Sequence, residues 1–268
     1  MYYAKSIGGE LLPNRFICRS CTEMLPKDEL RTVQPMVSHA GRQFEAREER
    51  ALYALASPAA STLPGSERGV ILVSEVPGPL GQPDFIALVG GNHWLERRIS
   101  SGIPPQLVQA DCAVLSMLHV NRPLSESSLL HRIGWSSTDL APVLRKLHRV
   151  GAVKITKGGA YCVIPELVPQ GALFALEAKV KNWQRAMIQG RAYRSWADNY
   201  VVLLGGVGTI ARQRAAEAIA NDEAGLFSDH RWIVKPRARR ANVAKRLWGF
   251  EYVYAAIVSS VPSFRSGE

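Results

Sequence analysis

The residues Ala172–Lys179 read ALFALEAK, an apolar run that ends in two charged side chains. A short apolar run of this kind is typical of a buried β-strand. Because positions i and i+2 of a strand lie on the same face, Glu177 and Lys179 are expected to point the same way. Two charged residues at the end of an apolar strand are unusual, so this stretch predicts a functional site at one end of a sheet.

A second predicted strand carries a carboxylate at its end. Residues 69–76 (GVILVSEV) and 84–89 (DFIALV) are expected to be strands of a hairpin, joined through the turn PGPLGQ. Asp84 begins the second of these strands. If that strand lies beside residues 172–178, then Asp84, Glu177 and Lys179 meet at one point.

These three side chains predict phosphodiester hydrolysis. Two carboxylates that are held together repel each other and favour a cation between them. Oxygen ligands at a partly hydrated site suit Mg²⁺ or Mn²⁺, which lowers the pKa of bound water and neutralises charge on a phosphoryl group. Lys179 is expected to orient the attacking water or to stabilise the pentacovalent phosphate.

The same residues resemble the motif of the PD-(D/E)XK nuclease superfamily. Pro83-Asp84 matches its PD element, and Glu177-Ala178-Lys179 matches its (D/E)XK element. The resemblance implies an α/β, restriction-endonuclease-like core with a mixed central sheet flanked by helices, in the order helix, strand, strand, strand, helix, strand. It also implies a further acidic residue from the first helix or strand, and the available positions are Glu48 or Glu49 and Glu75.

A further match follows on the next predicted helix, residues 180–197. Gln189-Gly-Arg-Ala-Tyr193 resembles the Q-x-x-x-Y motif of the RecB-like branch. Spaced i and i+4, Gln189 and Tyr193 share a helix face and are expected to hold a DNA phosphate or nucleotide. The alternative interpretation is a surface ion pair between Glu177 and Lys179 and a core position for Tyr193. The cations of this helix that are expected to contact DNA are Lys181, Arg185, Arg191 and Arg194.

The segment between the two halves of the motif resembles a winged helix-turn-helix. Helices are expected at residues 107–120, 125–133 and 138–150, and a hairpin over 151–164 turns at Lys-Gly-Gly. The alternative role for such a module is protein interaction. The side chains expected to contact DNA phosphates are Arg145, Lys146, Arg149, Lys154 and Lys157.

These patterns divide the chain into four parts. Residues 1–40 form an N-terminal segment, 41–100 and 169–268 form the two parts of the nuclease core, and 105–168 form the inserted winged helix. The first part opens with an amphipathic helix at 41–56, which a Pro/Ser-rich break follows. The second part is completed by a helix at 209–219 and by strands at 200–204, 225–227 and 232–235.

Cys18 and Cys21 form a CxxC pair, which is half of a zinc site. Completion would require His39, or Cys112 and Cys162 from the winged helix. Two free thiols or a dimer contact is the favoured interpretation, Zn²⁺ the second, and an iron–sulfur cluster the third.

Composition narrows the classes of partner. The 268 residues include 33 Lys and Arg against 23 Asp and Glu, which gives a net charge of +10. Such a balance favours a polyanion, and the excess is concentrated in residues 179–250. No stretch approaches the roughly 18 apolar residues of a membrane span, and the N-terminus lacks the apolar core of a signal peptide. We therefore expect no membrane partner and a cytoplasmic location.

The sequence thus predicts a Mg²⁺-dependent deoxyribonuclease whose winged helix helps to dock DNA. A homodimer or a larger nucleoprotein complex is compatible with this assignment, and the patterns do not distinguish endonuclease from exonuclease or DNA from RNA. The alternative is a non-catalytic winged-helix DNA-binding regulator or adaptor on a degraded nuclease fold.

Overall fold

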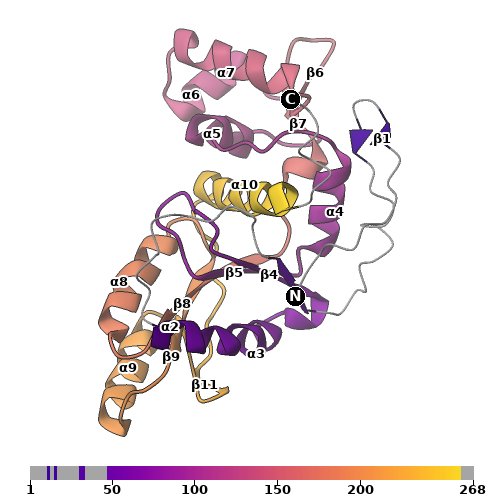
Figure 1. Cartoon of the computed structure of the whole chain (residues 1–268). Coiled ribbons are helices and arrows are strands. Elements are labelled where there is room, and N and C mark those ends of the chain that lie inside the picture. Colours follow the sequence, from indigo (N-terminus) through magenta and orange to yellow (C-terminus); the bar gives the residue numbers. More distant parts are fainter. Residues whose placement is uncertain (1–10, 13–14, 17–29, 34–46, 261–268) are drawn as a thin grey trace.

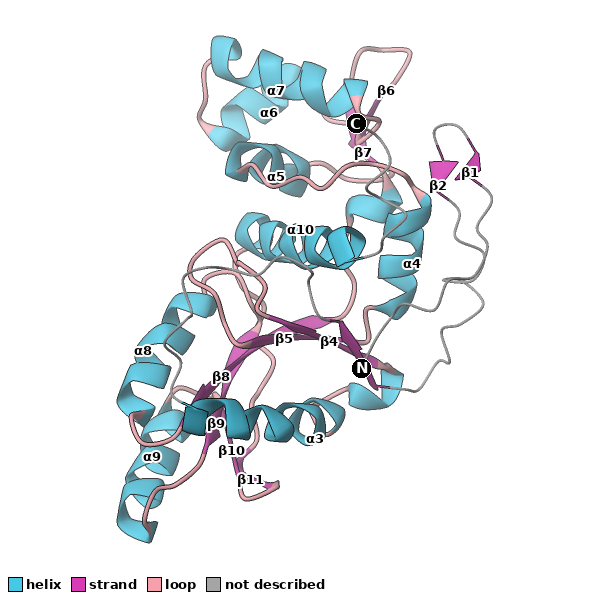
Figure 2. Cartoon of the chain, in the orientation of Figure 1, coloured by secondary structure: helices cyan, strands magenta, loops and turns pink. Residues whose placement is uncertain are grey.

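The structure is a computed structural model of the chain, and it describes residues 11–12, 15–16, 30–33 and 47–260. Its centre is a seven-stranded mixed sheet in the order β11-β10-β9-β8-β5-β4-β3 (Figures 1 and 2). Strands β4, β5 and β8 are antiparallel neighbours, whereas β9 is parallel to β8. The predicted α/β class with a mixed sheet is confirmed. The strands are β3 (Leu30–Val33), β4 (Val70–Ser74), β5 (Phe85–Val89), β8 (Ala172–Lys179), β9 (Asn199–Leu204), β10 (Gly225–Ser228) and β11 (Arg231–Val234).

Helices cover both faces of this sheet because alternate side chains of its strands point to opposite sides. In β8, Leu173 and Ala175 belong to one core, and Phe174 and Leu176 belong to the other. The first core is closed by α4 (Asn92–Ser100), α8 (Trp183–Tyr193), α9 (Thr209–Asn221) and α10 (Val243–Ser260). The second core is closed by η2 (Leu52–Leu55) and α3 (Ala56–Ser61), which follow α2 (Arg47–Ala51).

The break predicted from residue 57 begins later, at residue 62. The chain stays helical through α3, with Pro58 in the first turn. A proline is tolerated there because the backbone N–H groups of a first turn have no partner within the helix. The beginning of the predicted helix, residues 41–46, lies outside the described residues.

Helices α4 and α10 were not predicted. Helix α10 begins inside the basic run of residues 235–246, and its buried side chains extend around most of its circumference, so it shows no polar stripe. It lies between the sheet and α5 (Gln109–Met117), where both sides of the helix are covered (Figure 2).

Residues 109–163 build a small unit on the far side of α10 (Figure 1). The three helices and the hairpin expected there are present, and they pack around one core to which Leu247 of α10 also belongs. The Ser125 and Ser136 side chains accept hydrogen bonds from Ser128 N and Asp139 N, which caps two of the helices. Its elements after α5 are α6 (Glu126–Ile133), α7 (Ser137–Arg149), β6 (Val153–Ile155) and β7 (Tyr161–Val163).

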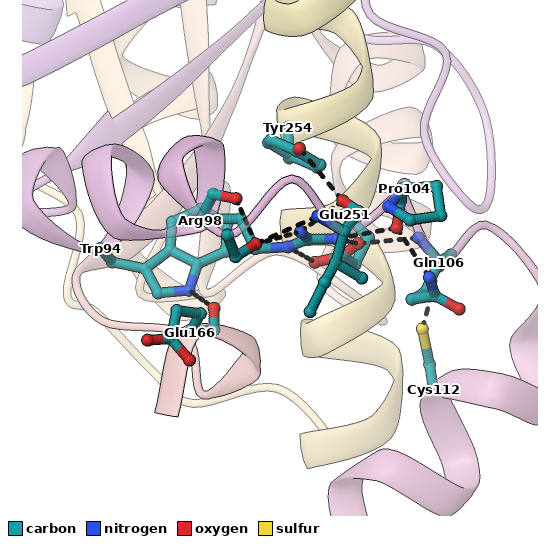
Figure 3. A network of polar contacts seen from close by, with 10 residues as sticks. Trp94, Arg98, Pro104, Gln106, Cys112, Glu166, Glu251 and Tyr254 are labelled. Atoms are coloured by element: carbon teal, nitrogen blue, oxygen red, sulfur yellow. Dashed lines mark hydrogen bonds and ion pairs between the residues drawn. The ribbon is translucent and has the colours of Figure 1, made fainter. Parts of the chain in front are cut away.

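A buried ion pair joins α4 to α10 beside the linker that leads into this unit (Figure 3). Arg98 Nε and Nη2 donate to the two carboxylate oxygens of Glu251 at 2.9 and 2.8 Å, and both side chains are 0% exposed. The linker is held by the same groups, because Arg98 donates to Ile103 O and Pro104 O, and Gln106 N donates to Glu251. The network therefore fixes the path of the chain between the sheet and the small unit.

None of the described helices combines the length and apolarity needed to cross a bilayer. The remaining described elements are short or peripheral. The short elements are β1 (Leu11–Leu12), β2 (Arg15–Phe16), η3 (Ser66–Arg68) and η4 (Pro165–Leu167).

Candidate active site

Sheet register brings the two halves of the predicted motif together. Phe85 pairs with Leu176 across the antiparallel strands β5 and β8, so Asp84 and Glu177 come to the same end of this strand pair. Asp84 Oδ2 accepts the backbone N–H of Ala178 at 2.7 Å, and Asp84 Oδ1 accepts the hydroxyl of Tyr53 at 3.1 Å. Two carboxylates that are 93 positions apart in the sequence are thus buried side by side.

Lys179 lies between acidic groups from two elements. Its Nζ is 2.9 Å from Glu177 Oε1 and 3.5 Å from Glu49 Oε2, and it donates to Ala178 O at 2.9 Å. Glu49 lies on α2, the first described helix. The resemblance implied a further acidic residue from the first helix or the first strand, and Glu49 is in such a position. The Lys179 side chain is 12% exposed, whereas that of Glu177 is 2% exposed, so the lysine is the more accessible partner of this pair.

Burial and neighbouring charges shift the pKa values of Glu177 and Lys179. Burial raises the pKa of the Glu177 carboxyl above its usual range, the charge of Asp84 raises it further, and contacts with Lys179 and Tyr193 oppose both effects. For Lys179, burial acts to lower the pKa, but Glu177, Asp84 and Glu49 raise it more, so the net shift is upward. The ammonium is therefore charged at neutral pH, while the paired carboxylates favour a second positive charge nearby.

The two residues of the predicted Q-x-x-x-Y motif have different surroundings. The Tyr193 hydroxyl donates to Glu177 Oε2 at 3.0 Å, and its ring contacts that of Trp196, so this tyrosine belongs both to the core and to the site. Gln189 is half-buried, and its Oε1 is buried without a hydrogen-bond partner among the described residues. A buried amide oxygen without a partner is energetically costly.

Glu75 lies beside Asp84 through the backbone rather than through its side chain. It follows β4 with a φ of 53°, and its N–H donates to Asp84 O at 2.9 Å. A non-glycine residue in the left-handed region is strained, and such residues cluster at functional sites. Among the described residues, none forms a hydrogen bond or ion pair with the Glu75 carboxylate.

The donor set fits a hard divalent cation. Asp84 and Glu177 supply carboxylate oxygens, and Mg²⁺ is usually bound through one or two carboxylates together with waters and substrate phosphates. Within residues 47–260, no group of three or more His, Cys, Asp or Glu side chains is arranged to hold a metal. Asp84 and Glu177 are therefore the two described carboxylates at this site that could contribute oxygen ligands to such an ion.

The predicted DNA-contacting cations fall into two groups. Arg191 forms a bidentate contact with Asp222, and Lys146 is paired with the buried Asp111, so both already have acidic partners. The others form no ion pair with any residue that the structure describes. Those with exposed side chains are Arg145, Arg149, Lys154, Lys157, Lys181 and Arg185, and Arg194 is half-buried.

The predicted zinc pair Cys18 and Cys21 lies outside the described residues, as does His39. Cys112 and Cys162, the other cysteines considered for that site, are described and have buried, free thiols. Burial raises the pKa of the Cys112 thiol well above its ordinary value, which keeps it protonated.

Tyr53 is a site residue that sequence reasoning missed. It is four positions after Glu49 in a segment expected to be helical, so the two would share a helix face. That spacing was the only signal available, since no motif marks a tyrosine there. Its ring packs edge-on against Phe85 at 4.7 Å, which places the hydroxyl at Asp84.

Tyr193→Phe tests the contact with Glu177. We expect a loss of about 1.5–3 kcal/mol in unfolding free energy, because a hydrogen bond to a buried charged group is removed while the ring remains. Urea denaturation measures this loss. Tyr252→Phe, on the partly buried face of α10, is the control, and an equal loss in both variants would contradict a special role for Tyr193.

Comparison of the chain with protein-family models, curated proteins and solved structures gives no match. The functional interpretation consequently rests on the geometry of this site.

Proposed function

We propose that the protein is a metal-dependent nuclease of the PD-(D/E)XK kind that hydrolyses DNA phosphodiester bonds. One observation carries the proposal, namely that Asp84 and Glu177 are buried together at the end of β5 and β8 with the Lys179 ammonium 2.9 Å from Glu177. Two carboxylates can bind a divalent ion that activates water, and a neighbouring ammonium can offset the charge that develops on the phosphate.

The order of elements supports the proposal. Helices α2 and α3 precede β4, β5 and β8, and α8 and β9 follow. This is the helix, strand, strand, strand, helix, strand order that the resemblance implies, with α4 and the small unit between β5 and β8. The long separation of Asp84 from Glu177 is accounted for by that intervening segment.

Each side chain can be given a role from its contacts. A divalent ion held by Asp84 and Glu177 would activate water and offset the charge of the phosphoryl group. Lys179, already oriented by Glu49 and Glu177, would hold the attacking water or a phosphate oxygen. Tyr193 keeps the Glu177 carboxylate in place, and the side-chain N–H groups of Gln189 would donate to a phosphate oxygen of the substrate.

The small unit would dock the DNA as a winged helix. Helix α7 and the β6–β7 hairpin present Arg145, Arg149, Lys154 and Lys157 on exposed positions, and cations on such elements contact backbone phosphates. The buried network at Arg98 and Glu251 would keep this docking surface at a fixed place relative to the sheet.

Arg149→Ala and Lys157→Ala test the docking role. Each is expected to weaken DNA binding at all sequences and to lower the slope of log affinity against log salt by roughly one. Fluorescence anisotropy over a salt series measures both quantities. Arg68→Ala, which removes an exposed cation outside the small unit, serves as the control. The docking role would be contradicted if all three variants bound DNA like the wild type.

The proposed function is tested by incubating the protein with supercoiled plasmid, linear duplex and single-stranded DNA. We expect strand breaks in Mg²⁺ or Mn²⁺ and none in EDTA. The proposed function would be rejected if all three DNA substrates stayed intact, or if strand breaks also formed in EDTA. Cutting of circles as well as ends would identify an endonuclease.

A second candidate is a non-catalytic DNA-binding regulator or adaptor. The observation that favours it is that both oxygens of each carboxylate already contact a protein donor, with Lys179 neutralising Glu177. Stoichiometric DNA binding without cleavage in any metal would support this alternative.

A further inference from the structure

A pocket of about 590 Å³ opens between the beginnings of α8 and α9, outside the carboxylate cluster. Its volume is in the range of sites that hold small organic ligands. None of the residues that line it is acidic. They are Trp183, Gln184, Gly208, Thr209, Ile210, Ala211 and Arg214.

The pocket adjoins the same edge of the sheet as the candidate active site. Strands β8 and β9 are parallel, so the segments that follow them leave the sheet side by side, and Gly205 N donates to Lys179 O at 3.3 Å. Trp183 is four residues after Lys179, a span of at most about 14 Å. Helices α8 and α9, which these segments lead into, are neighbours (Figure 1).

The wall combines an aromatic ring, an exposed aliphatic side chain and a cation, namely Trp183, Ile210 and Arg214. Trp183 packs against the core on one side and is partly exposed, and Ile210 is 72% exposed. Outside the lining, Ile188 on α8 is 68% exposed, and Lys181 and Arg185 are exposed near the beginning of the same helix. No described residue forms an ion pair with Lys181, Arg185 or Arg214. Together with the ring of Trp183, the two isoleucines leave apolar surface exposed on and beside the pocket.

This combination is the one that recognises an unstacked nucleobase. A tryptophan face offers stacking to any base, and neighbouring cations hold the phosphates of the same strand. The absence of acidic groups from the wall disfavours cationic ligands. A base within a duplex is stacked between its neighbours, so only an unpaired or flipped base can enter such a pocket.

We propose that the pocket at Trp183 binds a nucleobase of an unpaired DNA strand next to the scissile phosphate. The inference rests on the proposed function in taking the substrate to be DNA, and it deepens that function by naming the substrate class as single-stranded or locally unpaired DNA.

The test measures binding in EDTA, so that it does not depend on cleavage. Labelled oligonucleotides are compared by fluorescence anisotropy as single-stranded oligothymidylate, as its duplex with oligoadenylate, and as an abasic single strand of equal length. The wild type should bind the single strand more tightly than either of the others. Trp183→Ala should weaken single-strand binding by about 5- to 150-fold, the usual range for one lost stacking contact, and Trp183→Phe should retain most of it.

Trp135→Ala is the matched control. Trp135 is another partly buried tryptophan, and it lines a pocket of about 570 Å³ in the small unit. We expect it to bind the single strand like the wild type. Thermal unfolding of all three variants shows whether each is folded, and Trp183→Phe gives the comparison if Trp183→Ala is not.

Three results would overturn the inference: no single-strand binding by the wild type, equal binding of normal and abasic strands, or equal weakening by the variants at positions 183 and 135. Failure of the proposed function has a different signature. In that case single-strand binding would depend on Trp183, but no DNA would be cut when Mg²⁺ or Mn²⁺ is supplied.

Discussion

Lys179→Ala is expected to reduce DNA cleavage by at least about 10²- to 10³-fold, the range found when one preorganised charge-stabilising group is removed. The physical reason is that its ammonium is the cation held at the two carboxylates, 2.9 Å from Glu177 Oε1. DNA binding should change little, because many other cations contribute to it. Gel-based cleavage rates at saturating protein measure the effect.

Two further variants separate chemistry from folding. Lys179→Arg keeps the charge but changes its geometry, and it should remain severely impaired while folding like the wild type. Glu217→Gln, an exposed carboxylate on α9, should cleave normally. Wild-type rates for Lys179→Ala in a folded protein would refute the assignment of Lys179.

Arg98→Ala is expected to lower the unfolding free energy by about 3–5 kcal/mol, because it leaves the Glu251 carboxylate buried without its partner. Both side chains are 0% exposed, and Arg98 contacts both carboxylate oxygens as well as the carbonyls of Ile103 and Pro104. Urea denaturation followed by circular dichroism measures the loss.

The double variant Arg98→Met/Glu251→Leu should be more stable than Arg98→Ala, since no uncompensated charge remains. Arg191→Ala is the matched control, because that arginine forms a similar bidentate contact with Asp222 but is 57% exposed. An ion pair whose arginine is exposed to solvent is screened and contributes less, so its loss should be smaller. Equal destabilisation by Arg98→Ala and Arg191→Ala would contradict the importance of burial.

Most of the sheet could be predicted because its strands are continuous apolar runs with clear turns between them. Strands β4, β5, β8 and β9 have buried side chains on both faces, and such strands are marked by composition alone. Helix α10 escaped prediction for the opposite reason. It is covered on two sides, so it has no polar stripe, and its start is hidden in a basic run.

The sequence could predict that Asp84 lies beside Glu177 only on the assumption that two strands far apart in the sequence are neighbours in the sheet. The sequence of the two strands does not determine that they pair with each other. The structure shows that β5 and β8 are antiparallel neighbours, and their register brings the two carboxylates together. Tyr53 contacts Asp84, which is 31 positions away in the sequence, and Arg98 contacts Glu251, which is 153 positions away. A single sequence gives no periodic signal for contacts of this kind.

Binding of Mn²⁺ addresses the central claim most directly, that Asp84 and Glu177 act together as one ion site. Electron paramagnetic resonance of Mn²⁺ titrated into the metal-free protein gives the number of ions bound per chain. The wild type and Glu217→Gln should share a site that Asp84→Asn and Glu177→Gln both lack. Equal Mn²⁺ binding by all four proteins, or none by the wild type with or without DNA, would contradict the claim.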